Sequence, residues 1–491
     1  MQSLPDLAQL SHEQKDELIR QLWPLVQQVK DLMTEVSTMQ ARIKELEGRL
    51  SLNSRNSSKP PSSDGMGKQN PKPKSLRKPG QNKTGGQPGH EGHTLRQSIQ
   101  VDQVIEHPGP SHCTACQQAL SEFEVIDRRQ VFELPVLRPL VIEHRLLRAR
   151  CSCGAVHMGQ WPEGVNAPAQ YGPGVKALAV HLNQHHLLPC KRTGEVLRDV
   201  FGLYTSQASL LAFAAEAARQ LKPTVAAIAQ AVQGAAVVHA DETGIRVQDK
   251  LQWLHCAVTP TLTWLGHHHK RASVAFEALG VLSGFKGTLV HDGLAGYRKL
   301  DCLHSLCNAH HLRELTFVHE QEQAFDPWAQ EMIDLLLLAH GEIQHNTGQP
   351  LEADRQAWFH GRWDVLLATG ETFNPPHRKP DGAPDGRRGR TKQSKAFNLL
   401  RRLRDYRTEV WRFMTDPGVP FTNNLAEQAL RMAKVKQKIS GCFRTGHGAD
   451  TFFTIRSYLA TMHKQKHNLL ACLVSVFERQ TIEPCLAGCA E

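Results

Sequence analysis

The sequence contains no apolar run that approaches the roughly 20 residues a helix needs to cross a bilayer. Its first residues lack the basic stretch and apolar core of a secretory signal peptide. We therefore expect a cytoplasmic protein. Disulfides are rare in that compartment, so the 12 cysteines argue against a disulfide framework and favour metal ligands or buried thiols.

The chain also lacks an excess of acidic residues. It has 58 Lys and Arg against 48 Asp and Glu, which gives a formal charge of +10. Such a surplus favours a polyanionic partner such as nucleic acid, although a solvated basic surface has the same composition. With 491 residues, 40% of them hydrophobic, the chain is globular and too long for one core. We expect about two to four domains.

Residues 1–52 are predicted to form a coiled-coil helix. Apolar residues recur there at alternating steps of three and four, the spacing of an a/d seam sustained for about four heptads. The seam consists of Leu22, Leu25, Val29, Leu32, Val36, Met39, Ile43, Leu46 and Leu50. This pattern predicts pairing of protomers. The alternative is an amphipathic helix that packs on its own protein.

Two segments are basic and of low complexity. Residues 53–98 are rich in Lys, Pro, Gly and Ser and contain almost no large apolar residue, so they cannot form a core. They are either a plain linker or an arm that binds nucleic-acid phosphates. Residues 375–390 are rich in Pro, Gly and Arg. They are either a second DNA contact or a solvated loop.

Residues 99–160 are predicted to form a small β-rich zinc module. Short strands are expected at 131–134 and 141–144, and a pair of cysteines lies on either side of them. Four thiolates suit the tetrahedral coordination of zinc. The predicted ligands are Cys113, Cys116, Cys151 and Cys153, and His107, His112 and His157 are alternatives.

Residues 161–235 have a helical pattern. Two helical stretches, at 193–201 and 205–221, are separated by a break at Gly202. This spacing resembles a helix-turn-helix, but any helical hairpin produces it. DNA contact and plain packing both stay open for this region.

The order of elements becomes informative after residue 236. A strand leads to Asp241, two further strands and a helix follow, and a fourth strand leads to Asp292. This β-β-β-α-β order is that of the ribonuclease H-like fold, in which the first and fourth strands are neighbours. The two aspartates should therefore converge. A third acid, Glu427, lies on a predicted helix. The predicted core comprises residues 236–315 and 416–455, with a helical insertion at 316–415 and a C-terminal helical segment at 456–491.

Two aspartates at strand ends and a glutamate on a helix suit a two-metal phosphoryl-transfer site. Carboxylate oxygens are the ligands that Mg²⁺ or Mn²⁺ requires. We expect Asp241 to contact both ions and Asp292 and Glu427 to hold one each. The attacking group would be water in strand cleavage and a 3′-hydroxyl in strand transfer.

Each acid also has a simpler interpretation. Glu427 could complete a capping box, and Asp292 could be a turn residue. Glu242 could take the place of Asp241, although strand alternation points it to the other face. Several histidines invite a zinc-enzyme interpretation, but core or solvated positions are the more common ones. These are His239, His267, His268, His269 and His291.

Together these features resemble the IS66-type transposases of the DDE superfamily. The resemblance covers nearly the whole chain, and its most specific element is the motif at residues 53–64. It implies that Asp241, Asp292 and Glu427 are the catalytic triad of an enzyme that cleaves and joins DNA at the ends of an insertion sequence. Gln428 departs from the family pattern, because an arginine commonly follows the glutamate. The second cysteine pair is also tighter than usual.

The resemblance implies several partners. They are the terminal inverted repeats of the element, the target DNA, a second copy of the chain or a higher oligomer paired through the N-terminal helix, and accessory proteins of the same element. It also implies a bacterial, nucleoid-associated location. Two alternatives stay open. One is an inactive, transposase-derived DNA-binding protein or repressor, and the other is a different ribonuclease H-like nuclease such as a junction resolvase.

Overall fold

The computed structural model describes residues 10–52, 56–57, 95–121, 123–321, 327–346, 349–377 and 392–487. Most of the predicted basic arm, and residues 378–391 with most of the second basic segment, lie outside this set. The chain divides into two compact units. Unit 1 comprises Met1–Pro71, Gly172–Pro189 and Leu211–Glu491, and unit 2 comprises Lys72–Tyr171 and Cys190–Leu210.

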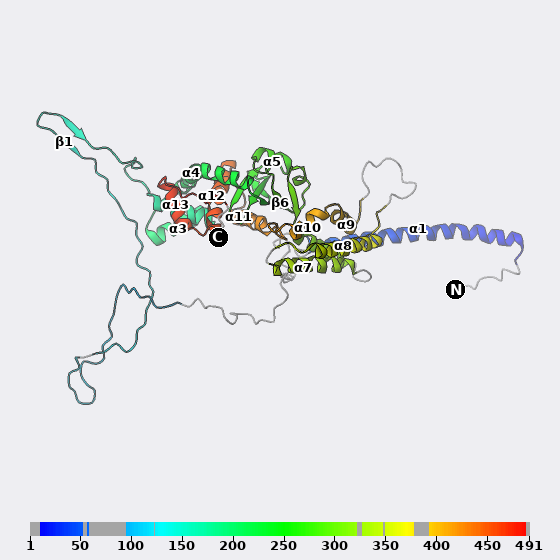
Figure 1. The fold of residues 1–491 in the computed structure, drawn as a ribbon, viewed down its shortest axis with the longest axis horizontal. Coiled ribbons are helices and arrows are strands. Elements are labelled where there is room, and N and C mark those ends of the chain that lie inside the picture. The colour runs from blue at the N-terminus through cyan, green and yellow to red at the C-terminus, as the bar shows by residue number, and fades with distance from the viewer. Residues whose placement is uncertain are drawn as a thin grey trace. The chain divides into compact units, whose positions relative to one another are not determined.

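Unit 1 is built around a five-stranded sheet with the strand order β5-β4-β3-β6-β7 (Figure 1). The strands are β3 (Val237–Val247), β4 (Lys250–Val258), β5 (Thr263–His268), β6 (Thr288–His291) and β7 (Leu303–Leu306). The first three are antiparallel, and β6 and β7 run parallel to β3. The first and fourth strands of this series are therefore adjacent, as we expected from the element order.

A tight hairpin joins the two longest strands. Gln248 and Asp249 have φ angles of 51° and 58°, the left-handed values that a two-residue type I′ turn requires. This turn fixes the register of β4 against β3, in which Thr243 pairs with Leu254. Because side chains alternate along a strand, the register also decides which face each residue of β3 occupies.

Helices cover the antiparallel half of the sheet. Helix α11 (Asn424–Ser440) lies against β3 and β4, and α12 (Gly446–Lys464) lies against β5. Their apolar faces share one buried cluster with the strands, to which Leu254, Leu430 and Phe453 belong. Short α5 (Ser273–Leu279) contributes Phe276, which stacks on Tyr297 of the 3₁₀ turn η3 (Tyr297–Lys299).

A second core lies in a helical region between β7 and α11. Its helices are α6 (Asn308–Gln321), α7 (Trp328–His345), α8 (Ala353–Phe373), α9 (Lys395–Asp405) and α10 (Arg407–Thr415). Three fully buried tryptophans anchor it, namely Trp328, Trp363 and Trp411. Large aromatic side chains of this kind supply most of the buried apolar area in a small helical core.

The remaining helices belong to both units. In unit 1, α2 (Pro173–Val180) continues into the π-helix η2 (His181–His185) and packs against α13 (Leu469–Phe477). Helix α3 (Cys190–Phe201) belongs to unit 2, and α4 (Gln207–Gln233) crosses from unit 2 into unit 1. The break between α3 and α4 coincides with the predicted helix-turn-helix break, but α4 runs beyond the predicted end at residue 221.

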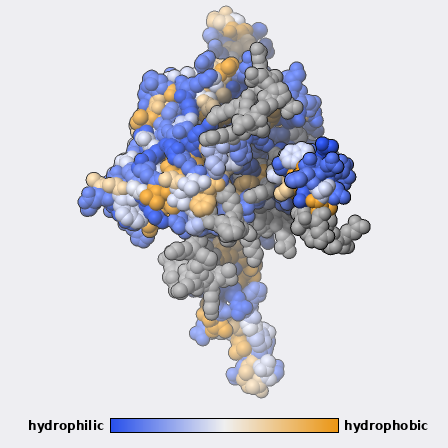
Figure 2. Space-filling model, turned by 90° about the vertical axis from the view of Figure 1, so that its right-hand side faces the viewer, coloured by the Kyte–Doolittle hydropathy of each residue, from blue (hydrophilic) through white to orange (hydrophobic). Residues whose placement is uncertain are grey.

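Helix α1 (His12–Leu50) carries the heptad seam on an exposed face. The nine seam side chains are 42–72% exposed. Near the end of the helix, Gln321 of α6 donates a hydrogen bond to Ser51 Oγ at 3.0 Å. The exposed seam leaves both the pairing of protomers and the packing on its own protein as predictions. Elsewhere hydrophobic residues are scattered over a mainly hydrophilic surface (Figure 2).

Unit 2 contains one small sheet. Strands β1 (Arg148–Arg150) and β2 (Val156–Met158) form an antiparallel hairpin around the second cysteine pair. The strands predicted at 131–134 and 141–144 are wrong, since neither segment forms a ladder and both Val131 and Val141 are 88% exposed. β-branched residues favour a strand only where a neighbouring strand and a covered face are present.

None of the helices in the described part of the chain is both long and apolar enough to span a membrane.

We expect Gly370→Ala to destabilise unit 1. An added Cβ would lie 2.8 Å from Leu400 Cδ2 and 2.9 Å from Trp328 Cδ2, inside the helical core. The expected cost is about 1–3 kcal/mol in the free energy of unfolding. Gly361→Ala is the matched control, because its Cβ would meet open space on the same helix and should stabilise by up to about 1 kcal/mol. Urea unfolding of both variants measures the difference, and equal effects would contradict the packing described.

Candidate active site

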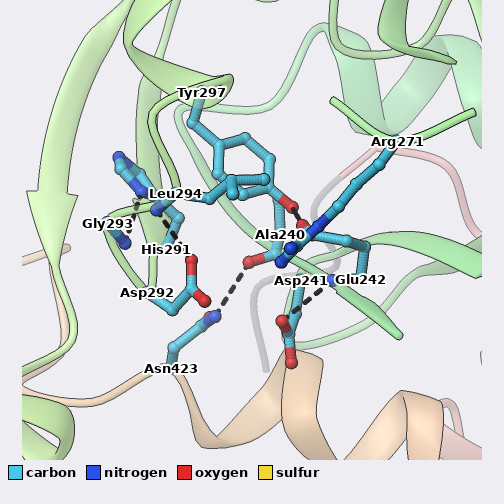
Figure 3. Close-up of polar contacts among 10 residues, drawn as sticks. All are labelled: Ala240, Asp241, Glu242, Arg271, His291, Asp292, Gly293, Leu294, Tyr297 and Asn423. Carbon is cyan, nitrogen blue, oxygen red and sulfur yellow. Dashed lines mark hydrogen bonds and ion pairs between the residues drawn. The ribbon is translucent and has the colours of Figure 1, made fainter. Parts of the chain in front are cut away.

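The sheet brings two aspartates to one edge. Parallel pairing places His239 of β3 opposite Val290 of β6. Two residues further along each strand, the same register sets Asp241 opposite Asp292, where β6 has just ended. Both side chains are half-buried. Figure 3 shows their carboxylates on the side of the sheet that faces the start of α11.

A buried asparagine holds the third acid beside them. Asn423 Nδ2 donates to the carbonyl of Ala240 at 2.8 Å, and its Oδ1 accepts from His239 Nδ1 at 3.0 Å. These bonds fix the start of α11 on β3, and Asn423 is 0% exposed. Glu427 then lies in the first turn of α11, where its charge acts on Asp241. No local pattern in the sequence indicates this role of Asn423.

The simpler interpretations of two acids can be compared with the geometry. The N-cap of α11 is Asn423, which makes no side-chain capping bond, so Glu427 does not complete a capping box. Asp292 does stabilise a turn, because its Oδ1 accepts from the backbone N–H of Leu294 at 3.0 Å. That bond uses one carboxylate oxygen and orients the other.

Glu242 points away from Asp241, toward the opposite face (Figure 3). Its side chain is completely buried. Tyr297 donates to Glu242 Oε2 at 2.5 Å, and Arg271 donates two bonds to Oε1 at 2.6 and 2.9 Å. Burial raises the pKa of Glu242, and the bonds from Tyr297 and Arg271 oppose that rise. The carboxylate of Glu242 is thus engaged by other side chains, and Asp241 stays the predicted metal ligand. No local pattern in the sequence indicates the contacts of Tyr297 and Arg271.

The cluster is electrostatically unfavourable without cations. Burial raises the pKa of Asp241 to about 8, and the negative charges of Asp292, Glu242 and Glu427 contribute to that shift. Like charges that must share a partly dry site favour protonation, whereas a bound cation favours the ionised form. The donor set consists of carboxylate oxygens, which suit a hard divalent cation. The chemistry of these donors therefore suits such an ion, whereas the oxygens of Asp241, Asp292 and Glu427 do not all lie within 4.8 Å of one another in this structure.

Helix α6 contributes two further groups. His310 Nδ1 lies 4.0 Å from Glu427 Oε1, and an Arg313 guanidinium nitrogen lies 3.9 Å from Glu427 Oε2. Burial lowers the pKa of His310, and the neighbouring Arg313 adds to that effect. Cys307 also has its thiol within 4.8 Å of the ligand atoms of His310 and Glu427. Sequence reasoning did not assign these residues, because only the packing of α6 against α11 brings them close.

The histidines that suggested a zinc enzyme occupy other environments. His239 is buried against Asn423, and burial lowers its pKa to about 4. His291 is buried beside His304, and burial lowers its pKa to about 3. His267 lies 3.1 Å from Asp450. In the part of the chain that the structure describes, none of them shares a group of three potential ligand atoms within 4.8 Å.

The two cysteine pairs lie in separate turns of unit 2. Backbone hydrogen bonds from Cys116 and Ala115 lower the pKa of Cys113, and one from Cys153 lowers the pKa of Cys151. Such turns favour the thiolate that zinc binds. No three of the four thiols lie within 4.8 Å of one another. Each pair fits a zinc ion, whereas the complete four-ligand site is not formed in this structure.

The fold is a mixed α/β sheet with acidic side chains at neighbouring strands, and comparison with known families identifies the class of protein. The model described as "Transposase IS66 family" matches residues 168–451, more than half of the chain. The protein therefore belongs to the IS66 family of transposases. The "zinc-finger binding domain of transposase IS66" matches residues 110–154, which supports structural zinc in unit 2. A "Family of unknown function (DUF6444)" matches residues 2–96.

Other comparisons add little. No curated protein matches the sequence. One solved structure with a matching chain is the "CryoEM structure of simian T-cell lymphotropic virus intasome in complex with PP2A regulatory subunit B56 gamma". That match has 14% identity, a TM-score of 0.13, and covers 33% of this chain and 53% of the other. It thus spans about half the length of the other chain, and its low TM-score supports no conclusion about the fold.

We expect Asp241→Asn to stabilise the cation-free protein as pH rises. Folded Asp241 keeps its proton up to about pH 8, whereas an unfolded aspartate loses it near pH 3.9. Between these values the folded wild type binds more protons than the unfolded chain, so its stability falls with pH. The free energy of unfolding of the variant should therefore exceed that of the wild type by a margin that grows, across this pH range, by up to about 1.4 kcal/mol per pH unit.

Unfolding in a chelator at several pH values measures this difference. Asp249→Asn, at the exposed turn between β3 and β4, is the control and should show no such trend. Parallel stability profiles for wild type and Asp241→Asn would contradict the electrostatic description of the site.

Proposed function

We propose that the protein cleaves and joins DNA strands at the ends of an insertion sequence, with Asp241, Asp292 and Glu427 as the catalytic acids. The observation that carries this proposal is the placement of Asp241 on β3 opposite Asp292 after β6, with Glu427 of α11 near enough for its charge to act on Asp241. Their mutual repulsion is strong enough to contribute to the raised pKa of Asp241. A cluster of this kind has no evident role in stability, because it costs free energy unless a cation is bound.

The sheet supports a ribonuclease H-like core. Its order, β5-β4-β3-β6-β7, places three antiparallel strands beside two parallel ones. That arrangement is the one we expected from the β-β-β-α-β element order. In it, Asp241 lies within β3, which continues to Val247 beyond the predicted strand end, and it stands opposite the point where β6 ends. A helix distant in sequence supplies the third acid.

The proposed cofactor is Mg²⁺ or Mn²⁺, with two ions in the site. Asp241 would contact both, and Asp292 and Glu427 would hold one each. When bound, two such ions activate the attacking oxygen and stabilise the departing 3′-oxygen. The chain itself contributes orientation. The Leu294 N–H fixes Asp292, and the bonds of Asn423 fix the helix that carries Glu427.

We also propose that Cys113, Cys116, Cys151 and Cys153 bind one structural zinc ion. The family match of unit 2 and the thiolate-favouring turns support this assignment. Binding would draw the two turns together and supply the folding free energy that the exposed segment between them lacks. Metal analysis of Cys151→Ser should show loss of one zinc per chain, whereas Cys442→Ser should retain it. Equal zinc contents would exclude this ligand set.

The exposed seam of α1 supports pairing with a second copy of the chain. Val29, Val36 and Ile43 occupy a positions, and Leu25, Leu32 and Leu46 are among the d positions. β-branched residues at a with leucine at d favour a parallel two-stranded coiled coil. The basic residues at 53–98, the helix pair α3–α4 and the accessory proteins of the element stay further proposed contributors to DNA binding and assembly.

We expect Asp292→Asn to abolish Mg²⁺- or Mn²⁺-dependent cleavage of the element's end DNA. The amide cannot supply the anionic oxygen that the cation needs. Binding of the same DNA in Ca²⁺ should be unchanged, because the substitution leaves the turn and the fold intact. A cleavage assay compares this variant with Asp249→Asn, which should remain active. Cleavage by Asp292→Asn at the control rate would refute the assignment.

We expect the double variant Val29→Glu, Val36→Glu to be monomeric. Charges in the seam prevent its burial between two helices. Light scattering should show the mass of one chain, 54.8 kDa, in place of at least twice that value. The control is Gln27→Glu, Thr34→Glu, which places the same charges on the exposed outer face of α1 and should keep the oligomer. A monomeric wild type would disprove the pairing.

A further inference from the structure

The N-terminal part of α6 carries two side chains beside the acidic site that binding of a cation by the three carboxylates does not require. His310 and Arg313 lie three residues apart, so they project from the same face of the helix. Both face Glu427, at 4.0 and 3.9 Å. The negative charge of Asp292 also acts on His310, which places the imidazole near two of the three acids.

These contacts are incomplete as hydrogen bonds. His310 Nδ1 and Glu427 Oε1 are buried, and among the described residues neither has a hydrogen-bond partner. A distance of 4.0 Å is too long for a hydrogen bond between them. A buried polar atom without a partner is costly, and such atoms in a site indicate a group that binds there. A group that binds here must accept hydrogen bonds from an imidazole nitrogen and a guanidinium. It must also be compatible with the cations that the carboxylates are proposed to hold.

A phosphate oxygen meets those requirements. It accepts hydrogen bonds from imidazole and guanidinium groups, and the latter is the usual partner of phosphates in proteins. It is also the group that must lie beside Glu427 for strand cleavage. We propose that His310 and Arg313 are further catalytic residues, which hydrogen-bond the non-bridging oxygens of the DNA phosphate that is cut and joined. This inference rests on the proposed function of the acidic site.

Cys307 suggests a different occupant for the same place, a soft metal ion bound by sulfur, nitrogen and oxygen. The structure favours a structural role for this thiol. Cys307 is 1% exposed, and its sulfur accepts a hydrogen bond from the backbone N–H of Asn423 at 3.2 Å. That bond joins the end of β7 to the start of α11. Binding of a soft metal ion is therefore the competing result that a Co²⁺ experiment distinguishes from phosphate binding.

The decisive experiment is a binding cycle that needs no catalysis. End DNA with an ordinary phosphate at the scissile position is compared with end DNA that carries a neutral methylphosphonate there, in Ca²⁺. Loss of the charged oxygen should weaken binding to the wild type by about tenfold or more, the scale of a charge-assisted hydrogen bond. In the double variant His310→Ala, Arg313→Ala the penalty should largely disappear. An equal penalty in both proteins would overturn the proposal.

Single-turnover cleavage provides a second readout. His310→Ala should slow cleavage by about 10²–10³-fold, the usual effect of removing one preorganised donor. His310→Asn should recover much of the rate, since its amide nitrogen occupies nearly the position of Nδ1. His319→Ala, in the last turn of α6, is the matched control. A raised Mg²⁺ requirement with an unchanged maximal rate would show that His310 only positions Glu427, which contradicts the proposal.

The remaining outcomes are separable. A Co²⁺ absorption band that is lost in Cys307→Ala would identify a soft-metal site and overturn the phosphate contact. If the wild type does not cleave DNA but the methylphosphonate penalty depends on His310 and Arg313, the proposed function fails while the phosphate contact stands. If the wild type cleaves DNA and the methylphosphonate penalty is independent of both residues, the proposed function stands and the phosphate contact fails.

Discussion

The burial of acidic groups near one another is the constraint on which the site in unit 1 depends. Burial is the largest cause of the pKa of Asp241 near 8, and the charges of Asp292, Glu242 and Glu427 add to it, so keeping these groups together costs the folded protein free energy. A structure that tolerates this cost must fix each carboxylate by other interactions. Without them, rotation of the side chains or separation of the elements would relieve the repulsion.

Those interactions come from separate parts of the fold. Asn423 ties the start of α11 to β3, and the Leu294 N–H fixes Asp292. On the opposite face, Tyr297 and Arg271 bind the carboxylate of Glu242. The negative charge of Glu242 therefore contributes to the raised pKa of Asp241 while its own oxygens are engaged by these two residues. Each contact is local, and together they fix the carboxylates of Asp292 and Glu242 and the start of the helix that carries Glu427.

The pairing of Asp241 with Asp292 could be predicted from the sequence because its signals are local, whereas their catalytic role stays a prediction. A buried strand that leads to an aspartate occurs twice, and the strand end predicted at Asp241 is wrong, since β3 continues to Val247. His310, Arg313 and Asn423 could not be assigned in this way, because their roles arise where β7, α6 and α11 meet across more than a hundred residues of chain. The strands predicted at 131–134 and 141–144 failed for a related reason. Residue preference cannot supply the neighbouring strand that a ladder needs.

Helix α6 touches two distant places at its ends. Its first turn faces Glu427, and at its last turn Glu320 and Gln321 bind Asn56 and Ser51, just beyond the end of α1. A helix of 14 residues is a stiff rod about 21 Å long. The residues that follow the long N-terminal helix and Glu427 thus contact opposite ends of the same rigid helix, which sets the distance between the two places.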